Sequence, residues 1–135
     1  MVVASAVIDC SALVRALADE TAAGESVRLR LSNELALAAP SLLDYELMSA
    51  LCGMIRGGKI TERRAARAIS SYQALGVARH ETLVLWERIM DLRHNISAYD
   101  AQYVALAEAL DLPLITCNAR IARSGAAKCP VEVFS

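Results

Sequence analysis

Short apolar segments alternate with longer segments of helical periodicity throughout the chain, and this alternation constrains the fold more than any other feature. Strands are expected at residues 2–9, 35–39, 77–80, 113–116 and 131–133. Helices are expected at about 11–18, 25–33, 42–56, 61–74, 82–93, 97–110 and 119–123. Because strands separated by helices pair in parallel, the predicted fold class is α/β, a three-layer sandwich with a central parallel sheet.

Capping and turn residues mark the ends of these segments. Ser11, Ser41 and Ser97 stand where helices are expected to begin, and serine is a favoured N-cap. Gly24 interrupts one helical pattern, and Gly76 ends another. The chain has no internal repeat and no linker-like tract, so its 135 residues are expected to form one domain, residues 1–135.

The N-terminal sequence, MVVASAVIDC, lacks a basic region followed by a long apolar stretch and a cleavage site. No apolar run is long enough to span a bilayer. The four cysteines have no metal-binding spacing and are interpreted as reduced thiols. We therefore expect a cytoplasmic protein with no membrane partner. Cys10 and Cys117 each adjoin a candidate site residue, so their oxidation would affect the site.

A carboxylate, Asp9, ends the first apolar segment in the stretch VIDCSALV. A buried carboxylate is costly unless something pairs with it. Asp9 therefore either caps the helix that follows or binds a cation. In parallel α/β sheets, ligands bind at the carboxyl ends of the strands. Asp9 lies at one such end, and Asn118 lies just past another.

Two further acids fall on helix faces that are otherwise apolar. Glu46 lies within the apolar stripe of the 42–56 helix, where a solvated position and a site position are about equally supported, while Asp44 points to the opposite side. Asp100 lies on the inward face of the 97–110 helix, but Ser97-x-x-Asp100 also fits a capping box. By spacing, Glu108 is expected to be an ordinary exposed charge.

Asp9, Glu46 and Asp100 can all reach one cleft at the carboxyl edge of the sheet. Three carboxylates brought together repel one another, and a hard divalent cation relieves that repulsion. Mg²⁺ prefers oxygen ligands and commonly bridges to a substrate phosphate. The three acids are therefore the candidate catalytic and metal-binding residues of a site that acts on phosphodiesters.

At this point the sequence resembles the PIN-domain ribonucleases, and specifically the VapC toxins of toxin–antitoxin pairs. The stretches that carry the resemblance are VIDCSALV, APSLLDYELMSAL, LRHNISAYDAQYVALAEALDLPLIT and CNARIAR. They have the order and spacing of that family and span essentially the whole chain. The most specific stretch is AYDAQYVALAEAL followed by PLIT and NARIAR.

The resemblance implies Mg²⁺- or Mn²⁺-dependent endonucleolytic cleavage of RNA on a parallel sheet flanked by helices. It also implies a homodimer and a cognate VapB-like antitoxin, with which a higher assembly would form. By motif position, the acids of the family fall on Asp9, Glu46 and Asp100. Ser11 and Thr116 match its hydroxyl residues and support the site.

The chain departs from the family pattern at Asn118. Many members read T-x-D where this chain reads Thr116-Cys117-Asn118, so the site holds three formal charges rather than four. An amide can still hydrogen-bond a water, but the loss of charge weakens a second metal. The alternative function is therefore a degenerate PIN domain that binds RNA or an antitoxin without efficient cleavage.

Two other families that begin with a strand ending in Asp fit less well. A haloacid-dehalogenase-type phosphatase requires D-x-D, but residue 11 is Ser. A response-regulator receiver domain requires an acidic pair after its first strand and a lysine after its last strands, and Lys128 is badly placed for that role.

Arginines dominate the basic residues, since only Lys59 and Lys128 are lysines, although the net charge is −1. Arginine binds phosphate bidentately. Arg93, Arg120 and Arg123 lie near the expected cleft and are candidates for contact with RNA, against the commoner interpretation of solvated surface charges. The apolar helix 42–55, with Leu13, Leu17 and Leu29, lines either a groove for an antitoxin helix or a dense core.

Overall fold

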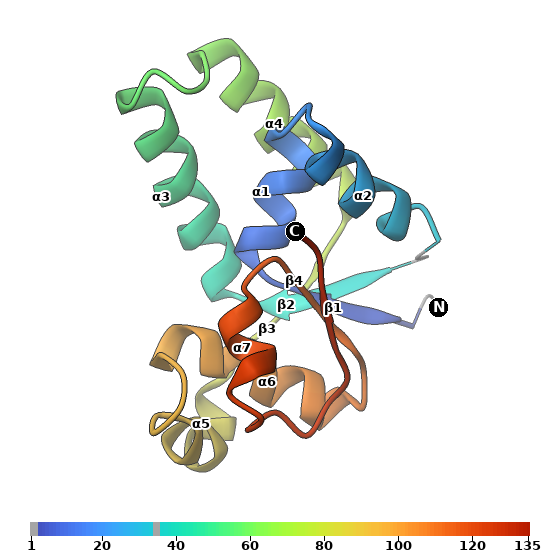
Figure 1. The fold of residues 1–135 in the computed structure, drawn as a ribbon, viewed down its shortest axis with the longest axis vertical. Helices are drawn as coiled ribbons and strands as arrows, with labels where there is room; N and C mark the ends of the chain where they lie inside the picture. The colour runs from blue at the N-terminus through green and yellow to red at the C-terminus, as the bar shows by residue number, and fades with distance from the viewer. Residues whose placement is uncertain (1–2, 34–35) are drawn as a thin grey trace.

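A five-stranded parallel sheet lies between two layers of helices in the computed structural model, which describes residues 3–33 and 36–135 (Figure 1). The strands are β1 (Ala6–Ile8), β2 (Leu37–Pro40), β3 (Ala78–His80), β4 (Leu114–Thr116) and β5 (Val131–Val133). Each neighbouring pair is parallel, with Val7 opposite both Ala38 and Leu114. The α/β three-layer fold predicted from the sequence is confirmed.

Helices cover both faces of this sheet. Figure 1 shows the first four on one side and the last three on the other side. The helices are α1 (Cys10–Ala18), α2 (Ala22–Leu31), α3 (Leu42–Arg56), α4 (Glu62–Leu75), α5 (Trp86–Leu92), α6 (Ala98–Leu110) and α7 (Ala119–Arg123), with a 3-10 turn, η1 (Leu83–Leu85), before α5. Within the described residues, no helix has both the length and the apolar character needed to cross a membrane.

The strand order β3-β2-β1-β4-β5 reverses direction between β1 and β4. The chain first builds outward from β1 to β3 and then crosses back, through α6, to β4. A crevice forms at the carboxyl ends of the two strands that flank such a reversal, and ligands of open α/β sheets bind there. Asp9 follows β1 and Cys117 follows β4, so both strands deliver candidate site residues to this crevice.

The core explains why so many positions are apolar. All three residues of β1 are fully buried, as is the inward row of α3, Leu43, Leu47 and Leu51. Burying a leucine or valine side chain stabilises the fold by about 1.5–3 kcal/mol. The sheet and the helices on both faces are therefore held as one packed unit, which fixes the crevice between β1 and β4.

Several element boundaries match the sequence prediction, and two do not. Ser97 caps α6 through its hydroxyl, and Gly76 ends α4 in a left-handed conformation with φ 60°. Ser11 is not the N-cap of α1, because Asp9 takes that place and its carboxylate accepts from the Ala12 N–H. Gly24 does not interrupt a helix but lies inside α2, where a Cβ would come within 1.9 Å of the Asp19 carbonyl oxygen.

Other expectations are corrected by tertiary contacts. The segment expected to be helical at 82–93 divides into η1 and α5. Glu108 is not an ordinary exposed charge, because Arg88 donates to both of its carboxylate oxygens, at 2.7 and 3.0 Å. Leu13 is fully buried, so it cannot line a surface groove, whereas Leu29 is 68% exposed. The strand residues predicted at positions 2 and 35 lie outside the described residues.

Candidate active site

Asp9 is the most deeply placed acid of the crevice, only 4% exposed at the end of β1. Its Oδ1 accepts from the Ser11 hydroxyl at 2.7 Å and from the Ala12 N–H at 3.0 Å. Its Oδ2 accepts a short hydrogen bond from the Thr116 hydroxyl. Asp9 therefore does cap a helix, and this capping uses only part of the acceptor capacity of a carboxylate.

The hydroxyls of Ser11 and Thr116 tie β1 to β4 around this carboxylate. They lie 3.3 Å apart, and each also accepts a backbone N–H, from Cys117 at 2.9 Å and from Asn118 at 2.9 Å respectively. These bonds explain why Ser11 does not act as the N-cap that the sequence indicated. The two hydroxyls instead fix the orientation of Asp9 at the junction of the two strands.

Glu46 reaches the crevice from the first half of α3 and is partly buried. Its Oε1 accepts from the Tyr103 hydroxyl at 2.5 Å. Tyr103 belongs to α6 and is only 1% exposed, so this bond joins the helices of the two layers. Glu46 is therefore partly buried against α6 and is not fully solvated, while its role in the site stays a prediction.

Asp100 lies in the first turn of α6 and is partly buried. The Ser97 hydroxyl accepts from the Asp100 backbone N–H at 3.1 Å, which is one half of the capping box that the sequence allowed. The Asp100 carboxylate instead accepts from the Asn118 side-chain amide at 3.2 Å. The backbone N–H of Asp100 is therefore used by the helix cap, while its carboxylate bonds Asn118 beside the crevice.

The three acids lie near enough for their charges to act on one another. Burial raises the pKa of Asp9, its hydrogen bonds oppose the shift, and the charge of Asp100 adds to the increase. Burial also raises the pKa of Glu46, against the Tyr103 hydrogen bond, with further increases from Asp100 and Asp9. Each shift means that negative charge is held here unfavourably, which is the condition that a bound cation relieves.

The donor set fits Mg²⁺ or Mn²⁺ in chemistry, since all three side chains offer carboxylate oxygens. Oε2 of Glu46 and Oδ1 of Asp100 accept no hydrogen bond from any described residue. No group of three or more His, Cys, Asp or Glu side chains in the described parts of the chain is arranged to hold a metal ion by itself. Mg²⁺ commonly binds through one or two carboxylates plus waters and substrate phosphate, so this arrangement suits it.

Comparison with known proteins identifies the family. A model of the PIN domain matches residues 6–126. Ribonuclease VapC9 of Mycobacterium tuberculosis is 37% identical over 127 residues, covering 94% of this chain and 96% of the relative. Ribonuclease VapC1 of the same organism is also 37% identical, over 128 residues. The chain belongs to the PIN-domain family of VapC ribonucleases.

Solved VapC structures have the same fold at low sequence identity. VapC20 of Mycobacterium tuberculosis, described as a toxin that cleaves the sarcin–ricin loop, superposes with a TM-score of 0.69 at 17% identity, covering 97% of this chain and 100% of that one. VapBC2 of Rickettsia felis, bound to a DNA fragment from its promoter, superposes with a TM-score of 0.67 at 14% identity, covering 96% and 98%. These likenesses support the PIN fold found for this VapC-family chain.

The remaining candidate residues are only partly brought to the site. Arg93 and Arg120 line a hollow that also contains Asp100, whereas Arg123 is exposed outside that lining. Burial, together with Glu46 and Asp9, raises the pKa of the Cys10 thiol to about 12. Burial likewise raises the pKa of Cys117, so both thiols are protonated and weakly nucleophilic at neutral pH.

The residue that sequence reasoning missed is Tyr103. Its spacing of three residues from Asp100 puts it on the same helix face, but nothing in the sequence pattern indicates a role for its hydroxyl. Burial raises the pKa of its hydroxyl well above the ordinary range, and the charge of Glu46 adds to the shift. A buried tyrosine hydroxyl normally finds a hydrogen-bond partner, and an inward glutamate on a neighbouring helix was the available signal.

Proposed function

We propose that this chain is the toxin component of a toxin–antitoxin pair, a Mg²⁺- or Mn²⁺-dependent endoribonuclease in which residues 1–135 form one PIN domain. The observation that carries the proposal is the convergence of three carboxylates, from β1, α3 and α6, at the reversal point of the sheet. Identity to VapC ribonucleases over nearly the whole chain supports the same assignment and does not favour a degenerate, non-cleaving domain.

Asp9, Glu46 and Asp100 are the residues that would hold the cation. When bound, a divalent cation supplies charge that offsets the developing negative charge of a phosphodiester and activates a water. The chain prepares this site by fixing Asp9 with Ser11 and Thr116. Tyr103 similarly fixes Glu46 through one oxygen, and the other oxygen accepts no hydrogen bond from any described residue.

Asn118 supports the site in two ways. Its side-chain amide donates to Asp100, and its Oδ1 accepts from the Arg120 backbone N–H at 3.1 Å, which caps α7. An aspartate at this position could cap α7 equally well but could not donate to Asp100. We propose that Asn118 orients Asp100 at the cost of one metal-binding charge.

We also propose a cytoplasmic location, a cognate VapB-like antitoxin and a homodimer. A hollow of about 580 Å³ between α1, α3 and α4 begins at Cys10 and Ser11 and extends past Val14 and Met54. Its mainly apolar wall, next to the acid cluster, suits an antitoxin segment. The apolar side chains exposed along η1 and α5, Leu83, Val84 and Trp86, support a second copy as another partner.

Incubation of the purified chain with total RNA tests the catalytic proposal. Wild-type protein, freed of any co-purifying partner, is compared with Asp9→Asn in the presence of Mn²⁺, Mg²⁺ or EDTA. We expect discrete fragments that require metal and vanish in the variant. Metal binding without any cleavage would instead support the degenerate domain, and Asn118→Asp would then test whether the missing charge restores activity.

A further inference from the structure

The arginines of the described chain divide into those with ion-pair partners and those without. Ion pairs with carboxylates are formed by Arg15, Arg30, Arg64, Arg79 and Arg88. Arg93 and Arg120 form none with any described residue, although both border the acid cluster. An arginine without a carboxylate partner keeps its planar set of donors free for a phosphate.

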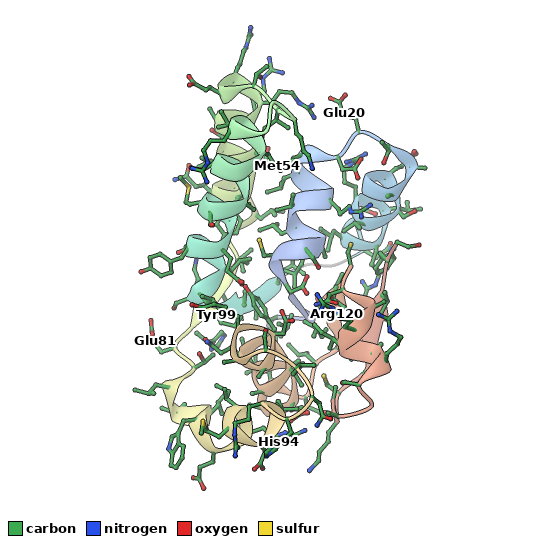
Figure 2. All side chains as sticks on the ribbon, turned by 60° about the vertical axis from the view of Figure 1, so that its left-hand side comes forward. Glu20, Met54, Glu81, His94, Tyr99 and Arg120 are labelled. Atoms are coloured by element: carbon green, nitrogen blue, oxygen red, sulfur yellow. The ribbon has the colours of Figure 1, made fainter. Side chains whose placement is uncertain are left out.

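These two arginines line the same hollow, Arg93 from the segment after α5 and Arg120 from α7. The hollow has a volume of about 490 Å³ and is lined by residues 93–97, between α5 and α6, together with Asp100 and Arg120. This volume falls within the range of about 300–1,000 Å³ that is typical of small-molecule sites. Figure 2 labels Arg120 on α7 and His94 in the turn that follows α5, the two segments that border the hollow.

The lining is rich in hydrogen-bond donors. Arg93 is anchored by one bond, from Nη1 to the Met90 carbonyl oxygen at 2.5 Å, and its other guanidinium N–H groups are not used by the described chain. The side chains of His94, Asn95 and Arg120 make no hydrogen bond to any described residue. Imidazole can stack on a base, and an amide can pair with base edges.

The geometry points to a nucleotide subsite in this hollow, which holds the RNA nucleotide adjoining the scissile phosphate. Arg93 and Arg120 bind its phosphate, while His94 and Asn95 contact its base. The inference rests on the proposed ribonuclease function and deepens it, because Asp100 belongs both to the hollow and to the acid cluster. A nucleotide seated here therefore places the neighbouring phosphodiester at the three carboxylates.

The chain links the subsite to the acid cluster through Asn118. This residue donates to Asp100 and accepts from the Arg120 backbone N–H, so it fixes the start of α7 relative to α6. The amide that distinguishes this chain from the usual family pattern thus sits between the metal-binding acids and the subsite. RNA fits the lining better than an antitoxin segment does, because cationic and amide donors outnumber the single carboxylate.

The first test measures the charge contribution of the arginines to RNA binding in EDTA, where no cleavage is possible. Binding of a fluorescent single-stranded RNA of random sequence is followed by anisotropy over a range of salt concentrations. Each lost phosphate contact should make the log–log salt slope shallower by about 0.7. We expect that change for Arg120→Ala and no change for Arg56→Ala, an exposed arginine at the far end of α3.

The second test uses NMR titration of the whole ¹⁵N-labelled chain with each of the four nucleoside 5′-monophosphates in EDTA. We expect amide shifts concentrated at residues 93–97 and 120, larger than those caused by inorganic phosphate. His94→Ala and Asn95→Ala should weaken nucleotide binding severalfold and leave phosphate binding unchanged. Circular dichroism melting curves establish that each variant is folded.

Several results would overturn the inference. Equal effects of Arg56→Ala and Arg120→Ala on the salt slope would show diffuse binding. Equal amide chemical-shift changes with phosphate and with nucleotides would show that the hollow binds anions without recognising a base. Shifts produced only by an acidic peptide would assign it to a protein partner. Because binding is measured without metal, absence of RNA cleavage would refute the ribonuclease proposal but leave these results interpretable.

Discussion

Replacement of Asp9 by Asn and by Ala separates the functional charge of this residue from its structural role. Burial raises the pKa of Asp9, which means that the folded state binds its proton more tightly than the unfolded state. The stability contributed by this group is therefore lost as the pH rises from about 3.9, the unfolded value, through the raised folded pKa. At pH 7 the ionised carboxylate destabilises the fold.

Both substitutions remove the negative charge, so the difference in free energy of unfolding between the two variants does not depend on that charge. Asn retains an acceptor for the Ala12 N–H, because Asn and Asp are comparable N-caps. Asn also keeps an oxygen for the Ser11 hydroxyl, and its amide nitrogen can donate to the Thr116 hydroxyl in place of accepting from it. Ala loses the cap, worth about 1 kcal/mol, and both of these side-chain bonds, worth about 1 kcal/mol each. We therefore expect Asp9→Ala to be about 2–3 kcal/mol less stable than Asp9→Asn.

Urea unfolding in EDTA, followed by far-ultraviolet circular dichroism, measures these stabilities. Trp86 is 56% exposed, so its fluorescence is a weaker reporter of unfolding. With a slope of about 2 kcal/mol per molar urea, the two variants should differ by roughly 1–1.5 M in midpoint. Asp9→Asn should be at least as stable as wild type at pH 7, and this advantage should vanish below about pH 4.

Urea unfolding of the same proteins with added Mn²⁺ tests whether Asp9 binds the cation. Ligand at 100 times its Kd stabilises a folded protein by about 2.7 kcal/mol, so Mn²⁺ should raise the wild-type midpoint and leave Asp9→Asn unchanged. If Asp9→Asn is instead destabilised as strongly as Asp9→Ala, the charge itself stabilises the fold. Asp9 would then be a structural capping residue and not a metal ligand.

Three further predictions follow from other contacts. Asn118→Asp should strengthen Mn²⁺ binding in calorimetry by adding a charge beside Asp100, and an unchanged affinity would place residue 118 outside the metal shell. Burial acts to raise the pKa of Glu108, but Arg88 and the Lys128 N–H outweigh it, so the pKa is lowered. Glu108→Gln should therefore lose about 1 kcal/mol at pH 7 in urea unfolding, a loss that disappears as the pH falls below about 4. Leu43→Ala should lose about 2–5 kcal/mol, whereas Leu29→Ala, at an exposed position, should change stability by less than about 0.5 kcal/mol; equal losses would contradict the burial pattern.

The fold was predictable because its signals are local. Alternation of apolar strands with helical segments gave the parallel α/β class, and Ser97 and Gly76 marked helix ends by capping chemistry that needs no distant partner. The placement of Asp9, Glu46 and Asp100 near one another also followed from local features, since each is an acid in an apolar setting. Their catalytic and metal-binding roles stay predictions.

The features that sequence reasoning missed depend on contacts between distant segments. Ser11 is drawn away from capping by bonds to Asp9 and to the Cys117 N–H, more than a hundred residues along the chain. Gly24 is required by the close approach of the Asp19 carbonyl oxygen, although a glycine at this position indicated a break in the helix. The role of the Tyr103 hydroxyl could not be inferred, because its partner Glu46 lies on another helix. The periodicity of apolar residues carries no information about hydrogen bonds between distant segments.

Calorimetric titration with Mn²⁺ tests most directly whether the three acids form one metal site. Wild type is compared with Asp9→Asn, Glu46→Gln and Asp100→Asn, with Asp111→Asn as the control. Asp111 is an acid at the C-terminal end of α6 with φ 56°, a conformation that asparagine tolerates. We predict at least about tenfold weaker binding in each of the three variants and unchanged binding in the control. Unchanged binding in Asp100→Asn would remove that residue from the metal site and contradict the joint site.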